Sequence, residues 1–149
     1  MLGWLKTNAT KAREALTTEV SKFKNKSFME ATAAACAMIA AADGQVSPVE
    51  KEKMAGFIKN SPELKVFDIT DVITSFNDSV AKFEFDPSLG KAEALKIINK
   101  IKSNDGASRL LVRVACAIGA SDGDFDEKEK AACRQICLEL GLNPADFEL

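Results

Sequence analysis

Two short acidic segments carry the residue types with the most specific chemistry in this chain. Residues 43–51 read DGQVSPVEK and residues 122–130 read DGDFDEKEK. Carboxylate oxygens are the ligands that hard cations such as Ca²⁺, Mg²⁺ and Mn²⁺ prefer, and they also attract basic partners. The sequence therefore offers five candidate residues for a divalent cation or a basic partner: Asp43, Glu50, Asp122, Asp126 and Glu129.

Neither acidic segment has the ligand pattern of an EF-hand. When Gly44 or Gly123 is aligned with the invariant glycine of that loop, the first and third ligand positions fall on isoleucine and alanine. Such side chains cannot bind calcium. We therefore expect no EF-hand here.

Helix capping explains much of the same pattern without any ligand. Ser47 and Asp126 have the residue types of N-caps, the glutamate three residues later completes a capping box, and the glycine of each segment is expected to end the preceding helix. Asp43 and Asp122 are left near helix C-termini, where the helix dipole disfavours an anion. An Asx turn or a bound positive charge would offset that cost, and the sequence leaves both explanations open.

A second candidate surface lies at the N-terminal end. Residues 1–25 have the spacing of an amphipathic helix, and residues 1–30 carry six Lys or Arg against three Glu. Such a helix either lies on an anionic membrane or packs its apolar stripe on its own bundle. The candidate residues for a partner or membrane surface are Trp4, Lys22, Lys24 and Lys26.

Composition excludes several classes of function. The chain has 149 residues, no His and a formal net charge of −2. The lack of His removes His-based acid–base and triad catalysis, and no Gly-rich phosphate loop is present, so we expect no enzyme. The small net charge argues against nucleic-acid binding. The four Cys form no CxxC pair and lie in apolar stretches, which predicts buried thiols in a cytoplasmic protein without a membrane span.

The hydrophobic spacing predicts helices almost throughout. After the N-terminal helix, the expected helices cover about 28–42, 48–60, 68–83, 87–101, 108–121 and 126–141, with short turns at 61–62 and 143–144. Alternation typical of a strand is scarce. The predicted fold is all-α, a compact bundle of about seven helices in a single domain over residues 1–149.

An internal repeat relates the two acidic segments at an offset of 79 residues. The matched pairs are Ile39 with Ile118, Ala41 with Ala120, Val46 with Phe125, Ser47 with Asp126, Glu50 with Glu129 and Lys51 with Lys130. The offset is too long for a solenoid unit. We therefore expect two helical hairpins, over about 28–60 and 107–141, related by a pseudo-twofold axis across one core.

An ordered set of motifs along the chain adds to this pattern. FKNKSFMEA, AAADGQVSPVEKEKM, SPELKVFD, FNDSVAKFEFD, LGKAEALK, ASDGDFDEKEK and LGLNPADFEL occur in this order. Together they resemble the TerB tellurite-resistance family over residues 4–149.

The resemblance implies a compact all-helical domain that acts in bacterial tellurite and stress resistance. It implies a cytoplasmic, partly membrane-associated binding component, with TerC-like membrane proteins and TerD-like calcium-binding proteins as partners and no catalytic residue. The family's suspected metal or partner site matches Asp43, Glu50, Asp122 and Glu129. Ser47 stands where the second segment has Asp126, so we do not expect equal metal affinity in the two segments. The alternative function is a metal-sequestering module without a protein partner.

Overall fold

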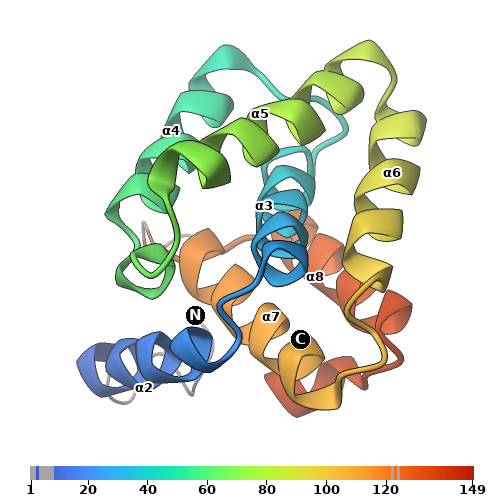
Figure 1. Cartoon of the computed structure of the whole chain (residues 1–149). Helices are drawn as coiled ribbons and strands as arrows, with labels where there is room; N and C mark the ends of the chain where they lie inside the picture. The colour runs from blue at the N-terminus through green and yellow to red at the C-terminus, as the bar shows by residue number, and fades with distance from the viewer. Residues whose placement is uncertain (1–2, 4–8, 122, 124) are drawn as a thin grey trace.

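The computed structural model describes residues 3, 9–121, 123 and 125–149, and within these ranges it is all-helical, as predicted (Figure 1). The seven α-helices of this part are α2 (Ala9–Lys22), α3 (Lys26–Ala40), α4 (Pro48–Asn60), α5 (Ile69–Phe85), α6 (Pro87–Asn99), α7 (Asp105–Gly119) and α8 (Glu127–Glu139). Two 3₁₀ turns, η1 (Pro62–Leu64) and η2 (Pro144–Phe147), complete the described elements, and none of them is a strand.

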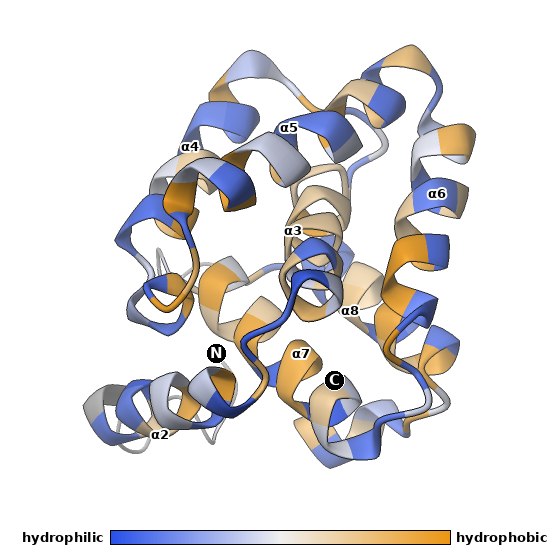
Figure 2. Ribbon diagram, viewed as in Figure 1, coloured by the Kyte–Doolittle hydropathy of each residue, from blue (hydrophilic) through white to orange (hydrophobic). Residues whose placement is uncertain are grey.

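Helix α3 forms the centre of the bundle, with α5, α6, α7 and α8 packed around it (Figure 1). Asn25 caps its N-terminus by accepting a hydrogen bond of 2.8 Å from the amide of Phe28. The side chains from residue 31 to residue 40 are all buried, as expected for a helix that is apolar on nearly every side. In Figure 2 this helix carries mostly apolar colours over its length. No helix in the described ranges is long and apolar enough to cross a bilayer.

Helices α5 and α6 pack unusually closely at Gly90. A Cβ atom at this position would lie 2.5 Å from the Cα of Phe83, so only glycine fits without moving one of the two backbones. Asp86 links the helices: its side chain accepts a hydrogen bond of 2.8 Å from the Ser88 amide and caps α6. The α5–α6 corner is therefore set by local capping and by one small residue.

Helix α2 packs on the bundle through its apolar stripe. Leu16 and Val20 have exposed fractions of only 4% and 0%, and α2 lies against η1 and α7, at the lower edge of the view in Figure 1. Of the two arrangements that the sequence leaves open for this helix, the described part from Ala9 onward has the one in which the stripe is buried in the protein. Of the segment before Ala9, only Gly3 is described.

The two halves of the repeat have identical element lengths. Adding 79 to the bounds of α3 gives those of α7, and adding 79 to the bounds of α4 gives those of α8. The N-caps of the first helices, Asn25 and Asn104, also match at this offset. The two hairpins contact each other across the core through α3, α7 and α8.

The glycines of the acidic segments do not end the helices, contrary to our expectation. Helix α3 ends at Ala40 with Ala41 as its C-cap, and α7 ends at Gly119 with Ala120 as its C-cap. Gly44 and Gly123 lie further along, in the connecting loops, at φ values of 99° and 79°. In this left-handed region a residue with a Cβ is strained. Each glycine therefore turns the loop after the helix has already ended.

Candidate functional site

The structure brings the two acidic segments to one cleft of about 220 Å³. Its lining residues come from the end of α3, from α4 and from the start of α8: Ile39, Ala40, Ala42, Asp43, Glu50, Lys53, Met54, Phe57, Asp126, Lys128 and Glu129. Four of the five predicted carboxylates thus share one cleft, although they lie on two segments 79 residues apart in the sequence. The fifth, Asp122, lies outside the described residues.

In the first segment, the carboxyl groups of Asp43 and Glu50 interact directly. The pKa of Glu50 is raised, first by burial and then by the negative charge of Asp43 and a hydrogen bond between the two side chains. The hydrogen bond from Ser47 and the charge of Lys53 lower it to a smaller extent. The negative charge of Asp43 thus disfavours ionisation of Glu50, and a positive ligand would relieve this repulsion.

Asp43 and Ser47 also make the local hydrogen bonds that the capping explanation requires. The Oδ1 atom of Asp43 accepts a long hydrogen bond of 3.3 Å from the Gln45 amide, which is an Asx turn. Ser47 Oγ accepts a hydrogen bond of 3.1 Å from the Glu50 amide and caps α4. The Asx turn thus satisfies part of Asp43's hydrogen-bonding capacity, while its carboxyl group still interacts with that of Glu50.

In the second segment, Asp126 and Glu129 form a complete capping box. Asp126 Oδ1 accepts a hydrogen bond of 2.8 Å from the Glu129 amide, and Glu129 Oε1 accepts one of 3.1 Å from the Asp126 amide. The predicted capping role of both residues is confirmed. Because a carboxylate has about four acceptor positions, this role and ligand binding do not exclude each other.

A buried apolar residue anchors the second loop to the core. Phe125 is 6% exposed, and a Cβ atom on Gly119 would lie 3.0 Å from its ring and 3.5 Å from Ile39. In the first loop Val46 occupies the matching position and is partly buried against the core. The apolar residue of the repeated motif thus holds each loop against the core, while Asp43 and Asp126 are exposed.

The cleft contains cationic and apolar side chains that our sequence reasoning missed. One face of α4 carries four of the lining residues with helical spacing: Glu50, Lys53, Met54 and Phe57. This spacing was the sequence signal that could have predicted that they share a face. The ammonium group of Lys53 lies 5.9 Å from the centre of the Phe57 ring. Among the described lining residues the acids outnumber the bases four to two, so the cleft carries a negative charge above an apolar floor.

The described carboxylates do not converge as a closed metal site. Within the ranges that the structure describes, no group of three or more His, Cys, Asp or Glu side chains could hold a metal ion. A divalent cation bound by these residues alone would have fewer than three carboxylate ligands and would keep several waters, as Mg²⁺ commonly does.

The basic N-terminal surface lies elsewhere on the molecule. Lys22, Lys24 and Lys26 are exposed around the α2–α3 connection, and Lys22 pairs with Glu19 at 3.4 Å. Lys24 and Lys26 line a separate groove of about 660 Å³, which shares no lining residue with the acidic cleft. Trp4, the fourth candidate of this surface, lies outside the described residues.

All four cysteines are buried, as predicted. Burial raises the pKa of Cys36 to about 12. The pKa of Cys133 is also raised, first by a hydrogen bond with Cys116 and then by burial. The thiols of Cys36 and Cys133 are therefore protonated at neutral pH, and all four thiols are shielded from solvent.

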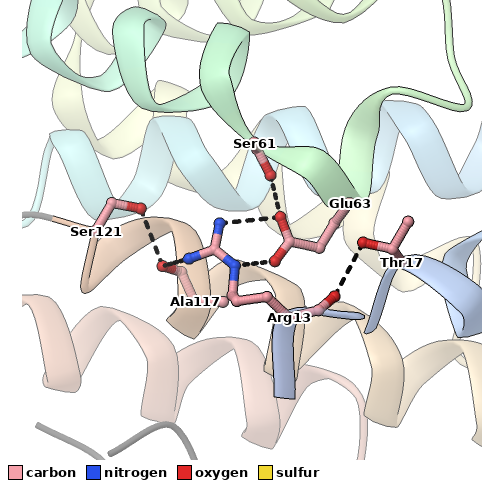
Figure 3. Close-up of polar contacts among 6 residues, drawn as sticks. All are labelled: Arg13, Thr17, Ser61, Glu63, Ala117 and Ser121. Carbon is pink, nitrogen blue, oxygen red and sulfur yellow. Dashed lines mark hydrogen bonds and ion pairs between the residues drawn. The ribbon is translucent and has the colours of Figure 1, made fainter. Parts of the chain in front are cut away.

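A polar network involving Arg13 joins α2 to the base of the second acidic loop (Figure 3). The guanidinium group contacts the carboxylate of Glu63, which also accepts a hydrogen bond from Ser61 Oγ. Arg13 Nη1 donates to the carbonyl oxygen of Ala117 at 3.3 Å, and Ser121 Oγ donates to the same oxygen at 3.1 Å. The sequence offered no local signal for this network, because its members are far apart along the chain.

The fold and the cleft define an all-helical domain in which a duplicated hairpin presents paired acidic loops. A family model described as "Tellurite resistance protein TerB" matches residues 29–149. A protein of an Alcaligenes species, "Tellurium resistance protein TerB", is 49% identical over 105 residues, which are 70% of this chain and 86% of that protein. The chain belongs to the TerB family, as the sequence motifs indicated. No solved structure matches it significantly.

Proposed function

We propose that this protein is a non-catalytic binding component of bacterial tellurite resistance and the associated stress response, and that its acidic cleft binds a positively charged ligand. One observation carries the proposal: Asp43 and Glu50 from one half of the repeat line the same cleft as Asp126 and Glu129 from the other half. The raised pKa of Glu50 supports it, because a bound cation would stabilise the ionised carboxylates.

The ligand chemistry is that of a hydrated divalent cation, namely Ca²⁺, Mg²⁺ or Mn²⁺, or of a basic side chain from a partner protein. Oxygen is the only donor type among the acidic groups of the cleft, which favours hard ions over soft ones. The apolar floor at Met54 and Phe57 would also accommodate the aliphatic part of a lysine or arginine. A metal-sequestering module without a protein partner is the alternative function.

The proposed role is non-catalytic because the described lining of the cleft includes no Ser, Thr or Cys nucleophile and no His acid–base group. The chain has no His, and the charged groups in the described lining are carboxylates and ammonium groups. The cysteine thiols are buried in the core. These side chains suit recognition of charge better than nucleophilic catalysis.

The proposed setting is the cytoplasm, with TerC-like membrane proteins and TerD-like calcium-binding proteins as partners. Lys22, Lys24 and Lys26 are the proposed contacts with a partner or with an anionic membrane. Since Leu16 and Val20 are buried, such a membrane contact would be electrostatic, and we expect flotation with phosphatidylglycerol vesicles to be lost at high salt. This contact is contradicted if the amount of protein that floats with the vesicles does not change at high salt or when the three lysines are replaced by glutamine.

Calorimetry tests the cleft directly. We would titrate Ca²⁺, Mg²⁺, Mn²⁺ and a hexa-arginine peptide into the wild type and into the Glu50→Gln/Glu129→Gln variant, in which glutamine preserves the capping geometry. The control is Asp78→Asn, at an exposed acid outside the cleft. We expect binding heat in the wild type and the control, and none in the cleft variant. The absence of binding heat with all three ions and with the peptide would overturn the proposal.

A further inference from the structure

We propose that the furrow between α6 and α8 is a docking site for an acidic amphipathic helix of a partner protein. This furrow consists of a groove of about 390 Å³ beside the start of α6 and a second hollow of about 390 Å³ beside the end of α8. Gln135 lines both, so they adjoin along α8. The proposal goes beyond the acidic cleft and does not depend on ligand binding there.

The α8 wall presents an exposed stripe with helical spacing. The stripe consists of four exposed residues at steps of three and four along the helix: Lys128, Ala131, Gln135 and Leu138. Leu138 is 67% exposed, although large apolar side chains normally avoid such exposure. At about 1.5 Å per residue, the 13 residues of α8 provide a track of about 20 Å, which suits a partner helix of three to four turns.

The floor of the groove is apolar and partly built from small residues. Met38 and Phe83 lie at its base beside Ala131 and Ala132. Short alanine side chains on α8 let a neighbouring helix approach closely, since the distance between helix axes depends on the side chains at the contact. Apolar side chains at every third or fourth position of a partner helix would fill this floor, in the usual manner of a helix bound in a groove.

The charges around the furrow select an acidic partner. Lys91, Lys102 and Lys128 line it, and none of the three has an ion-pair partner in the part of the chain that the structure describes. The acid in the described lining, Glu139, accepts a hydrogen bond of 2.8 Å from the Asn99 side chain. Three unpaired ammonium groups beside an apolar floor are complementary to a helix with glutamate or aspartate on its flanks.

A partner helix fits this furrow better than a second copy of the chain or a lipid surface. Over the residues described, the apolar faces of α2 to α8 are largely buried in the protein's own core, so these helices of a second copy have no long apolar face left to enter the furrow. A lipid surface would contact protruding apolar side chains, whereas Ala131, Ala132 and Phe83 line a hollow.

Two synthetic helical peptides provide the test. Both carry the same leucine stripe at positions i, i+3, i+4 and i+7, and one has glutamate on its flanks where the other has lysine. We expect the acidic peptide to bind about tenfold more tightly, with NMR shift changes confined to amides of α6, α8 and the α3–α4 loop. The Lys91→Glu/Lys102→Glu variant should reverse this preference, whereas the control Lys59→Glu/Lys65→Glu, at exposed lysines outside the furrow, should keep it.

Several results would overturn the proposal. They are equal affinity for the two peptides, shift changes located outside the furrow, and unchanged preference in Lys91→Glu/Lys102→Glu. If the wild type binds neither peptide but adsorbs to phosphatidylglycerol vesicles, and the variant does not adsorb, the furrow would be assigned to a membrane instead. If the wild type self-associates and the variant does not, the furrow would be assigned to a second copy of the chain. None of these outcomes depends on calorimetry of the acidic cleft, so the two proposals can fail separately.

Discussion

The guanidinium group of Arg13 contacts the carboxylate of Glu63, and Glu63 has no solvent-exposed surface. Arg13 Nη2 donates to Glu63 Oε2 at 3.0 Å, while Arg13 itself remains one quarter exposed. This pair ties α2 to the 3₁₀ turn η1, 50 residues further along the chain. Helix α2 precedes residues 29–149, which match the family model, yet its central arginine neutralises a buried acid of that region.

Removing Arg13 should destabilise the protein strongly. The Arg13→Ala variant leaves the Glu63 carboxylate buried without its counter-ion, which typically costs about 3–5 kcal/mol. Urea unfolding followed by circular dichroism measures the loss. The Arg13→Met/Glu63→Leu double variant should recover most of it, because it removes both charges, and Lys22→Ala should cost less than about 1 kcal/mol as the loss of an exposed pair. A loss below 1 kcal/mol for Arg13→Ala would contradict the role of this pair.

Replacing Glu50 by glutamine should stabilise the protein at neutral pH. Because the pKa of Glu50 is raised in the folded state, the folded protein binds its proton more tightly than the unfolded chain does. The free energy of unfolding therefore decreases as pH rises from the ordinary value of 4.5 through the raised pKa. The Glu50→Gln variant avoids this decrease.

Thermal unfolding at neutral pH and near pH 3 measures the effect. We expect the gain in Tm of Glu50→Gln over the wild type to be larger at neutral pH, where only the wild type carries the charge at this position. Glu52→Gln removes an exposed charge from the same helix and serves as the control. A gain that is equal at the two pH values would show that ionisation of Glu50 does not oppose folding.

The four cysteine thiols should not react with a thiol reagent in the native protein. Burial raises the pKa values of Cys36 and Cys137 to about 12, and the reactive species is the thiolate. With dithionitrobenzoate we expect little release of the chromophore at neutral pH and release from all four thiols in urea. Rapid reaction of the native protein at one thiol would contradict the packing of α3, α7 and α8.

Adding a methyl group at Gly90 should destabilise the α5–α6 corner by about 1–3 kcal/mol. The new Cβ would lie 2.5 Å from the Cα of Phe83, so the two helices would have to move apart. Gly56 is the matched control, because it also lies within a helix but has no atom within 4 Å of its added Cβ. Gly56→Ala should stabilise α4 by up to about 1 kcal/mol. Equal effects of the two substitutions on urea unfolding would be inconsistent with close packing at Gly90.

Local signals in the sequence predicted the helices well. Ser47 and Asp126, the predicted N-caps, accept hydrogen bonds from amides in the first turns of their helices. The ends of the helices that precede the acidic segments were predicted less well: α3 ends at Ala40 rather than at about residue 42, and α7 at Gly119 rather than about 121. A glycine with positive φ suits both a C-cap and a later loop turn, so its presence does not locate the helix end.

The amino-acid sequence by itself determined the all-helical class, the duplicated hairpin and the carboxylate positions, because periodicity, capping and repeats depend on residues close together or at one constant offset. Only the tertiary structure decided that Asp43 and Glu50 share a cleft with Asp126 and Glu129, that Lys53 and Phe57 join them, and that the stripe of α2 packs on η1 and α7. The physical reason is that these contacts join elements distant in sequence. Their geometry follows from how the helices pack around α3, a property of the whole core that no short stretch of residues encodes.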